Sequence, residues 1–371
     1  MYQAIYTASF LGAACGYMLS ISISLFLTYV KQSGPFIIGL AGFTGNFVYT
    51  VMTFLLSRYS KSKIHPLFFY SPLIMGISYF SILFSPVPLI FLFLVIGGAT
   101  CAFFWPSLQN CLSATDDDLR IGIYNLCWAG GVIVGSFSAG FLYAVSPFLP
   151  FTSGLLLYII NAFILFSNKD KLIIQRKDIY RERIEKPLSQ DIVRDIRILN
   201  FINFFAMGSI FFLYPKLGTI RGFTPQFIGS VIGILLISRF VTFFLLMDKP
   251  LILHPARFIL SCLFLCISCI LVGYGTSPIT IITGVVIMGI AGAFAYHNSL
   301  QMHIKYNLKT EINESLIGAG VFSGSLIAGI LGQIFNLPLA YVIIGTFILI
   351  SGLWYSRMSL FGLINRQSNT S

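Results

Sequence analysis

Charged residues are scarce in this sequence. Only 9 % of its 371 residues are Asp, Glu, Lys or Arg, whereas 57 % are hydrophobic. A typical soluble domain is about 25 % charged, so this chain has too little polar surface for a water-soluble enzyme or binding domain. A disordered chain is excluded as well, because disorder requires low hydrophobicity together with high net charge.

Catalytic motifs are missing too. The sequence has no phosphate-binding loop ending in Gly-Lys-Ser/Thr, no His-Glu-x-x-His and no Gly-x-Ser-x-Gly, so ATP-driven and hydrolytic chemistry have no support. An intramembrane enzyme would need a cluster of His, Asp and Glu at one depth, and His297 is the only histidine well inside an apolar run. We therefore expect neither an enzyme, nor a cofactor, nor a metal site.

What the sequence does contain is twelve long apolar runs. A membrane-spanning helix takes roughly 20 apolar residues, and backbone groups in lipid must be satisfied within the segment, which favours helices. We predict an all-α membrane protein whose spans lie near residues 4–29, 36–57, 67–85, 88–112, 121–145, 148–167, 198–217, 226–247, 255–275, 278–302, 315–336 and 338–356.

The basic residues predict the orientation. With the N-terminus inside, 19 of the 23 Lys and Arg residues fall in cytoplasmic connections, and only Lys31, Lys216 and Arg221 fall outside. This asymmetry places both termini in the cytoplasm. It also accounts for the net charge of +11 without a nucleic-acid partner. We expect a multi-pass protein of the cell membrane whose first apolar run, too long for a signal peptide, is retained.

The chain divides into two similar halves. Residues 168–197 are rich in charge and separate a six-helix bundle at 1–167 from a second bundle at 198–371. Pro35 to Gly39 matches Pro225 to Gly229 at an offset of 190, and Ala102-Phe103 matches Ala293-Phe294 at 191. A third match pairs Gly130 and Gly135 with Gly324 and Gly329 at an offset of 194. These repeats predict an internal duplication.

With these features the chain resembles the major facilitator superfamily over nearly its whole length. Pro35-Phe-Ile-Ile-Gly39 looks like the start of the family's helix 2, and Arg58 and Lys61 match cationic positions of its helix 2–3 loop. The resemblance implies two pseudo-symmetric six-helix bundles. The glycines of the fifth run follow the family's helix 5 motif, which makes Gly122, Gly131, Gly135 and Gly140, with Arg58 and Lys61, candidates for gating or helix packing. Passive packing and sliding contacts both explain such glycines.

Arg239 is the most informative residue for a binding site. It lies about ten residues from either end of its span, near the bilayer midplane, where a charge costs about 3 kcal/mol or more. Either backbone carbonyls satisfy it or it binds an anionic group in a central cavity. His297 could carry a coupling proton or be a hydrogen-bonded structural histidine. The family resemblance implies which helices line the central cavity, and polar and aromatic residues on those helices become candidates. The full set of substrate-binding candidates is Trp105, Gln109, Asn125, Trp128, Asn203, Arg239, Tyr296, His297 and Gln301.

We therefore expect a secondary transporter that moves a small organic solute, anionic or polar, by alternating access. Its partners would be that solute, membrane lipid and a coupling proton, and we expect it to act as a monomer. A hydrophobic-drug exporter is the alternative within this class. A receptor or a lipid scramblase is the alternative outside it; the short outer loops offer little surface for a receptor.

Overall fold

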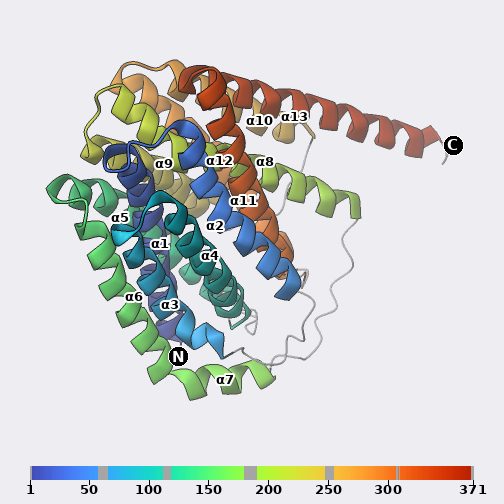
Figure 1. Ribbon diagram of the computed structural model, residues 1–371. Coiled ribbons are helices and arrows are strands. Elements are labelled where there is room, and N and C mark those ends of the chain that lie inside the picture. Colours follow the sequence, from blue (N-terminus) through green and yellow to red (C-terminus); the bar gives the residue numbers. More distant parts are fainter. Residues whose placement is uncertain are drawn as a thin grey trace.

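The computed structural model describes residues 2–56, 66–111, 118–178, 190–246, 255–305, 308 and 310–368. Within these ranges twelve helices are long and apolar enough to cross a membrane, which confirms the number expected from the sequence. In Figure 1, α13 runs across the top of the view, whereas the helices of the first half run side by side from top to bottom, with the short α7 across their lower end. We call this end the linker end and the opposite one, which carries the α1–α2 connection, the distal end.

The spanning helices of the first half are α1 (Tyr2–Tyr29), α2 (Pro35–Leu56), α3 (Leu67–Ser81, continued by a 3₁₀ turn at Ile82–Phe84), α4 (Val87–Asn110), α5 (Asp118–Val145) and α6 (Leu149–Ser167). After α7 (Lys169–Asp178), those of the second half are α8 (Gln190–Ile220), α9 (Pro225–Leu246), α10 (Pro255–Tyr274), α11 (Pro278–Lys305), α12 (Thr310–Ile334) and α13 (Leu337–Ser368).

Local sequence fixes where several helices begin. Pro35, Pro225 and Pro278 are the first residues of α2, α9 and α11, a position where the missing N–H of proline costs nothing. At the start of α13 the side-chain oxygen of Asn336 accepts a hydrogen bond of 2.8 Å from the backbone N–H of Leu339. This is a side-chain cap that satisfies an otherwise unpaired donor.

Two helices begin well before the residue that the sequence predicts, whereas the others begin within a few residues of it. Helix α8 begins at Gln190 instead of residue 198, and α12 begins at Thr310 instead of residue 315. Charged residues mark where the lipid ends, but a helix continues beyond that point as long as its backbone hydrogen bonds are satisfied. The extension of α12 puts Glu311 and Glu314 on a spanning helix, although both precede the span of 315–336 expected from the sequence.

The two halves pack their helices in the same pattern. In the first, α1 packs on α5 and α6, α3 packs on α4 and α6, and α2 packs on α4. In the second, α8 packs on α12 and α13, α10 packs on α11 and α13, and α9 packs on α11. Each pair corresponds to its counterpart six spanning helices earlier, which is the arrangement that an internal duplication predicts.

Glycine contacts fix the register of this repeat. A β-carbon added at Gly131 or Gly135 of α5 would strike a backbone carbonyl of α1, and one added at Gly320 or Gly324 of α12 would strike a backbone carbonyl of α8. These equivalent pairs are 189 residues apart, so the offset of 194 read from the sequence at these helices was wrong. A run of closely spaced glycines can be aligned in several ways, and the helix contacts select one.

The halves meet mainly through two helix pairs, α2 with α12 and α5 with α9, with smaller contacts of α1 and α2 against α8. At the distal end each pair is joined by glycines. A β-carbon added to Gly229 would lie 2.9 Å from Cα of Gly140, and one added to Gly329 would lie 2.9 Å from Cα of Gly39. Both distances are too short for any side chain, so these glycines allow the backbones of the two halves to touch.

Polar side chains join the halves nearer the linker end. The hydroxyl oxygens of Thr53 on α2 and Ser315 on α12 lie 3.0 Å apart. The side-chain amide of Asn110 on α4 donates a hydrogen bond of 3.1 Å to the carboxylate of Glu311. The contacts of these helix pairs therefore form two layers, glycines at the distal end and hydrogen bonds towards the linker end. A hydrogen bond of 2.6 Å from the Ser24 hydroxyl of α1 to the backbone carbonyl of Phe212 in α8 joins the halves as well.

Candidate functional site

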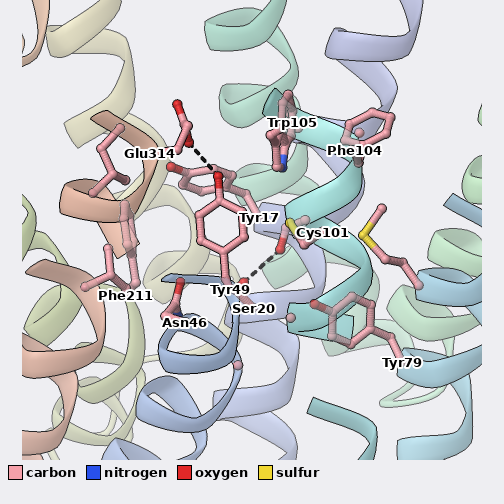
Figure 2. Close-up of a pocket in the computed structure, with 18 of the residues that line it drawn as sticks. Tyr17, Ser20, Asn46, Tyr49, Tyr79, Cys101, Phe104, Trp105, Phe211 and Glu314 are labelled. Atoms are coloured by element: carbon pink, nitrogen blue, oxygen red, sulfur yellow. Dashed lines mark hydrogen bonds between the residues drawn. The ribbon is translucent and has the colours of Figure 1, made fainter. Parts of the chain in front are cut away.

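A cavity of about 210 Å³ lies between the two halves. Helices α1 to α6 line it from the first half, and α8, α11 and α12 line it from the second. Its polar and aromatic lining residues are Tyr17, Ser20, Asn46, Tyr49, Tyr79, Cys101, Phe104, Trp105, Gln109, Tyr124, Trp128, Tyr158, Phe204, Phe211, Phe212, Tyr296 and Glu314. Figure 2 shows several of these side chains converging on one space.

Aromatic rings form a continuous wall across the boundary between the halves. Tyr17 on α1 meets Phe211 on α8 edge-on, with ring centroids 5.3 Å apart, and Trp128 on α5 at 6.3 Å. Trp128 in turn stacks on Tyr296 of α11, with centroids 5.7 Å apart and planes inclined by 20°. Rings at such distances attract each other beyond their burial, and they offer flat surfaces to a solute ring.

Glu314 carries the only formal charge among the described residues that line the cavity. It is 7 % exposed, and its carboxylate accepts hydrogen bonds from the Tyr49 hydroxyl at 2.6 Å and from the Gln109 side-chain amide at 2.9 Å. The short distance to Tyr49, visible in Figure 2, is that of a charge-assisted bond. A buried carboxylate in a spanning helix is costly and usually functional.

Glu314 was not predicted because the eleventh span, at 315–336, was expected to begin just after this charged residue. A signal was present, however. From Leu308 to Ile317 the sequence has no glycine or proline that would end a helix, so the helical pattern could have been continued back through Glu314.

Arg239 does not belong to the described lining of the cavity. It is 1 % exposed, and its guanidinium carbon lies 4.9 Å from the ring centre of Tyr296, 5.1 Å from Phe204 and 5.5 Å from Phe243. These are cation–π distances. One amino group also lies 2.7 Å from the sulfur of Met207.

Four of the nine predicted binding residues line the cavity: Trp105, Gln109, Trp128 and Tyr296. The structure places the other five outside its described lining. Asn203 is fully buried on α8 near Gly292, and His297 lies on α11 with its ring 6.5 Å from that of Phe243. The remaining three are half-buried Asn125 on α5, half-buried Gln301 on α11, and Arg239.

The predicted gating and packing residues fall into two groups. Arg58 and Lys61 lie outside the described residues. On α5, Gly122 is half-buried near the start of the helix, whereas Gly131 and Gly135 pack against α1 and Gly140 packs against α9. The last three thus form close backbone contacts, two of them within the first half and one between the halves.

Within the described ranges, no three His, Cys, Asp or Glu side chains come close enough to hold a metal ion. What the cavity offers is a stack of rings, neutral hydrogen-bonding groups and one carboxylate. Such a lining is suited to binding and releasing a small solute.

Comparisons with known proteins agree with this arrangement. The family model of the Major Facilitator Superfamily matches residues 5–311. The nucleoside transporter NupG has the same fold, with a TM-score of 0.71 at 14 % identity, covering 97 % of this chain and 98 % of that one. The human organic anion transporter MFSD10 has the same fold with a TM-score of 0.65 at 13 % identity, covering 95 % of this chain and 99 % of that one.

A third structure, a POT family transporter in complex with a thioalcohol-conjugated peptide, gives a TM-score of 0.71 at 11 % identity and covers 96 % of both chains. No curated protein matches by sequence. At such low identities the structural likeness establishes the fold and leaves the cargo open, and these three transporters are named for or bound to three different kinds of compound.

Proposed function

The chain belongs to the Major Facilitator Superfamily and is a multi-pass membrane transporter of the secondary kind, not an enzyme; we propose that it moves a small polar organic solute through the cavity between its halves. The main support for this proposal is the position of Glu314 in the cavity. This residue is a carboxylate held by Tyr49 and Gln109 in a spanning helix, beside an aromatic wall. A site of this kind binds through hydrogen bonds, ring stacking and one negative charge.

The lining changes the expected chemistry of the cargo. The preference for an anionic solute depended on Arg239 facing the cavity, but rings of Phe204 and Tyr296 lie against that side chain and also line the cavity. The charge that lines the cavity is negative. We therefore propose a solute that carries an amine or several hydroxyl groups. At about 210 Å³ the cavity is below the usual range of roughly 300–1,000 Å³ for ligand sites, which favours a small one.

Glu314 also supplies a group that can carry a coupling proton. An ionised carboxylate that is buried without a partner cation is strongly disfavoured, so a proton or a cationic solute that reaches Glu314 stabilises the site. A proton taken up on one side and released on the other would couple solute flux to the proton gradient. Glu314 lines the cavity, so we assign it this role in place of His297.

The alternation itself would come from the two layers of contacts between the halves. Opening the hydrogen-bonded layer at Thr53 and Ser315 would expose the cavity at the linker end, and opening the glycine layer at Gly39 and Gly140 would expose it at the distal end. The distribution of Lys and Arg supports the linker end as the cytoplasmic one. We propose that the protein acts as a monomer in the cell membrane.

A drug exporter is the second candidate. Most of the lining is aromatic or aliphatic, and a lone carboxylate among rings also fits an amphiphilic cation. The two candidates differ in direction and in cargo: a drug exporter would expel large lipophilic cations, whereas a polar-solute transporter would ignore them.

A flux screen in proteoliposomes tests the proposal. Purified protein would be assayed with labelled nucleosides, amines, sugars and small peptides, and with lipophilic cations, under an imposed pH gradient. We expect saturable uptake of a polar solute that Glu314→Gln uncouples from the pH gradient. Asp191→Asn, which changes a surface carboxylate paired with Arg194, is the matched control and should behave as wild type. Flux confined to lipophilic cations would support the second candidate, and no flux at all would contradict both.

A further inference from the structure

Arg239 lies directly behind the wall of the cavity. Phe204 of α8 and Tyr296 of α11 both line the cavity, and their rings are also within 5.1 Å and 4.9 Å of the guanidinium carbon. Two side chains therefore separate the cation from the solute space. The residue belongs to the surroundings of the site although it does not reach its surface.

The guanidinium is incompletely satisfied. Its Nε and Nη2 atoms are buried and have no hydrogen-bond partner among the described residues, and its Nη1 contacts only the weakly accepting sulfur of Met207. Aromatic faces attract a cation but do not replace the two in-plane acceptors of a carboxylate. The donors of Arg239 thus remain available to an anion.

Tyr296 is held in place by the other half of the protein. Its ring stacks on Trp128 of α5, and the guanidinium of Arg239 on α9 also lies over it. Because α5 and α11 belong to different halves, a movement of the halves relative to each other would separate this stack. Tyr296 would then keep its ring contacts with Phe204 and Phe243 of its own half, at 5.8 Å and 5.6 Å, and lose the stack that holds it from the other half.

We propose that Arg239 is a latent anion subsite, covered by Tyr296 while Tyr296 stacks on Trp128, and that the cargo is a zwitterion. This inference rests on the proposed function. The ammonium group of the solute would face Glu314, and its carboxylate or other acidic group would reach Arg239 once Tyr296 turns aside. Such a solute neutralises both buried charges in one occupied state, which an anion or a cation by itself does not achieve.

Thiol accessibility tests whether Tyr296 covers Arg239. Arg239→Cys in a cysteine-free background would be treated with the anionic reagent sulfonatoethyl methanethiosulfonate, and labelling would be followed by mass spectrometry. We expect slow labelling that becomes at least tenfold faster when Trp128→Ala is added. Leu236→Cys, buried on the same helix, is the control and should not respond to Trp128→Ala. Equal acceleration at both positions, or none at position 239, would overturn the proposal.

Cargo selectivity tests whether the transported solute is a zwitterion. Amino acids and other zwitterions would be compared with their esters, which are cations, and their N-acetyl derivatives, which are anions, as competitors and as transported solutes. We expect wild type to favour zwitterions at least tenfold over both derivatives. Arg239→Met should abolish the preference over esters while its melting temperature shows that it is folded.

The outcomes separate this inference from the proposed function. Saturable flux that Arg239→Met leaves unchanged, or a preference for solutes of a single charge type, would overturn the zwitterion proposal while leaving a transporter. Absence of saturable flux from folded wild-type protein would overturn the proposed function itself.

Discussion

Tyr49 and Arg239 occupy equivalent places in the two halves. Each lies seven residues before the last residue of its helix, α2 or α9, and they are 190 residues apart, as are Gly39 and Gly229 on the same helices. Tyr49 donates a hydrogen bond to Glu314 of α12, whereas Arg239 is surrounded by aromatic rings. Equivalent positions thus hold a partner of a carboxylate in one half and a buried cation in the other.

This divergence extends to the partner helices. With the offset of 189 residues between α5 and α12, Asn125 of the first half is the position equivalent to Glu314 of the second. Neither member of the pair on α5 and α9 has the chemistry of its counterpart on α2 and α12. The binding site is therefore asymmetric, although the helices that form it are arranged symmetrically.

Tyr49→Phe should weaken transport without unfolding the protein. The change removes one hydrogen bond to the carboxylate of Glu314, worth about 1.5–3 kcal/mol when the acceptor is charged. We expect the uptake rate to fall at least tenfold. Tyr70→Phe, at an exposed tyrosine of α3, is the control, and a Tyr49→Phe variant with wild-type uptake would show that this bond is dispensable.

Alanine substitutions at two neighbouring glycines of α5 should have very different effects on stability. An alanine at Gly131 would strike the backbone carbonyl of Phe10, whereas one at Gly130 meets only the Phe10 ring at an ordinary 3.6 Å. We expect Gly131→Ala to lose about 1–3 kcal/mol of stability and Gly130→Ala to lose none, since alanine favours a helix by about 0.5–1 kcal/mol. Melting in detergent measures both, and similar losses would contradict the packing described.

Arg239→Met should be at least as stable as wild type while losing the transport of zwitterions. A buried cation without an acid partner is costly, and methionine retains the apolar contacts with the surrounding rings. The measurement is the melting temperature together with uptake by the same preparation. A variant that melts well below wild type would show that the rings satisfy the guanidinium and that its role is structural.

Cross-linking should lock the layer near the linker end. The hydroxyl oxygens of Thr53 and Ser315 are 3.0 Å apart, a separation compatible with a disulfide between cysteines at these positions. In a cysteine-free background, Thr53→Cys with Ser315→Cys should lose at least nine-tenths of its uptake on oxidation and regain it on reduction. Uptake that persists in the oxidised protein would mean that α2 and α12 need not separate.

The sequence predicted the framework of the fold well because membrane insertion imposes strong constraints. The number of spans, the division into halves and the offset between α2 and α9 follow from hydropathy and from Pro35 and Pro225. It failed where charge was taken as the end of a helix, which concealed Glu314. It also could not establish which way Arg239 faces, since an apolar helix in lipid has no polar side to mark its orientation.

The candidate site was predicted in part for a related reason. Trp105, Gln109, Trp128 and Tyr296 were selected through their place on helices that the family resemblance assigns to the cavity, and all four line it. Tyr17 and Tyr49 were missed because tyrosine is common in this chain, with 18 copies. Only the contact with Glu314 distinguishes Tyr49 from the rest.

Accessibility of the cavity from each side of the membrane tests the central claim most directly. Ser20 lines the cavity, and Ser20→Cys in a cysteine-free background can be labelled by a membrane-impermeant thiol reagent applied to either face of oriented vesicles. Alternating access predicts labelling from both faces, and labelling only from the distal face once the cysteines at positions 53 and 315 are cross-linked. Labelling from one face alone in the unlocked protein, or unchanged labelling from the linker face after cross-linking, would contradict the account.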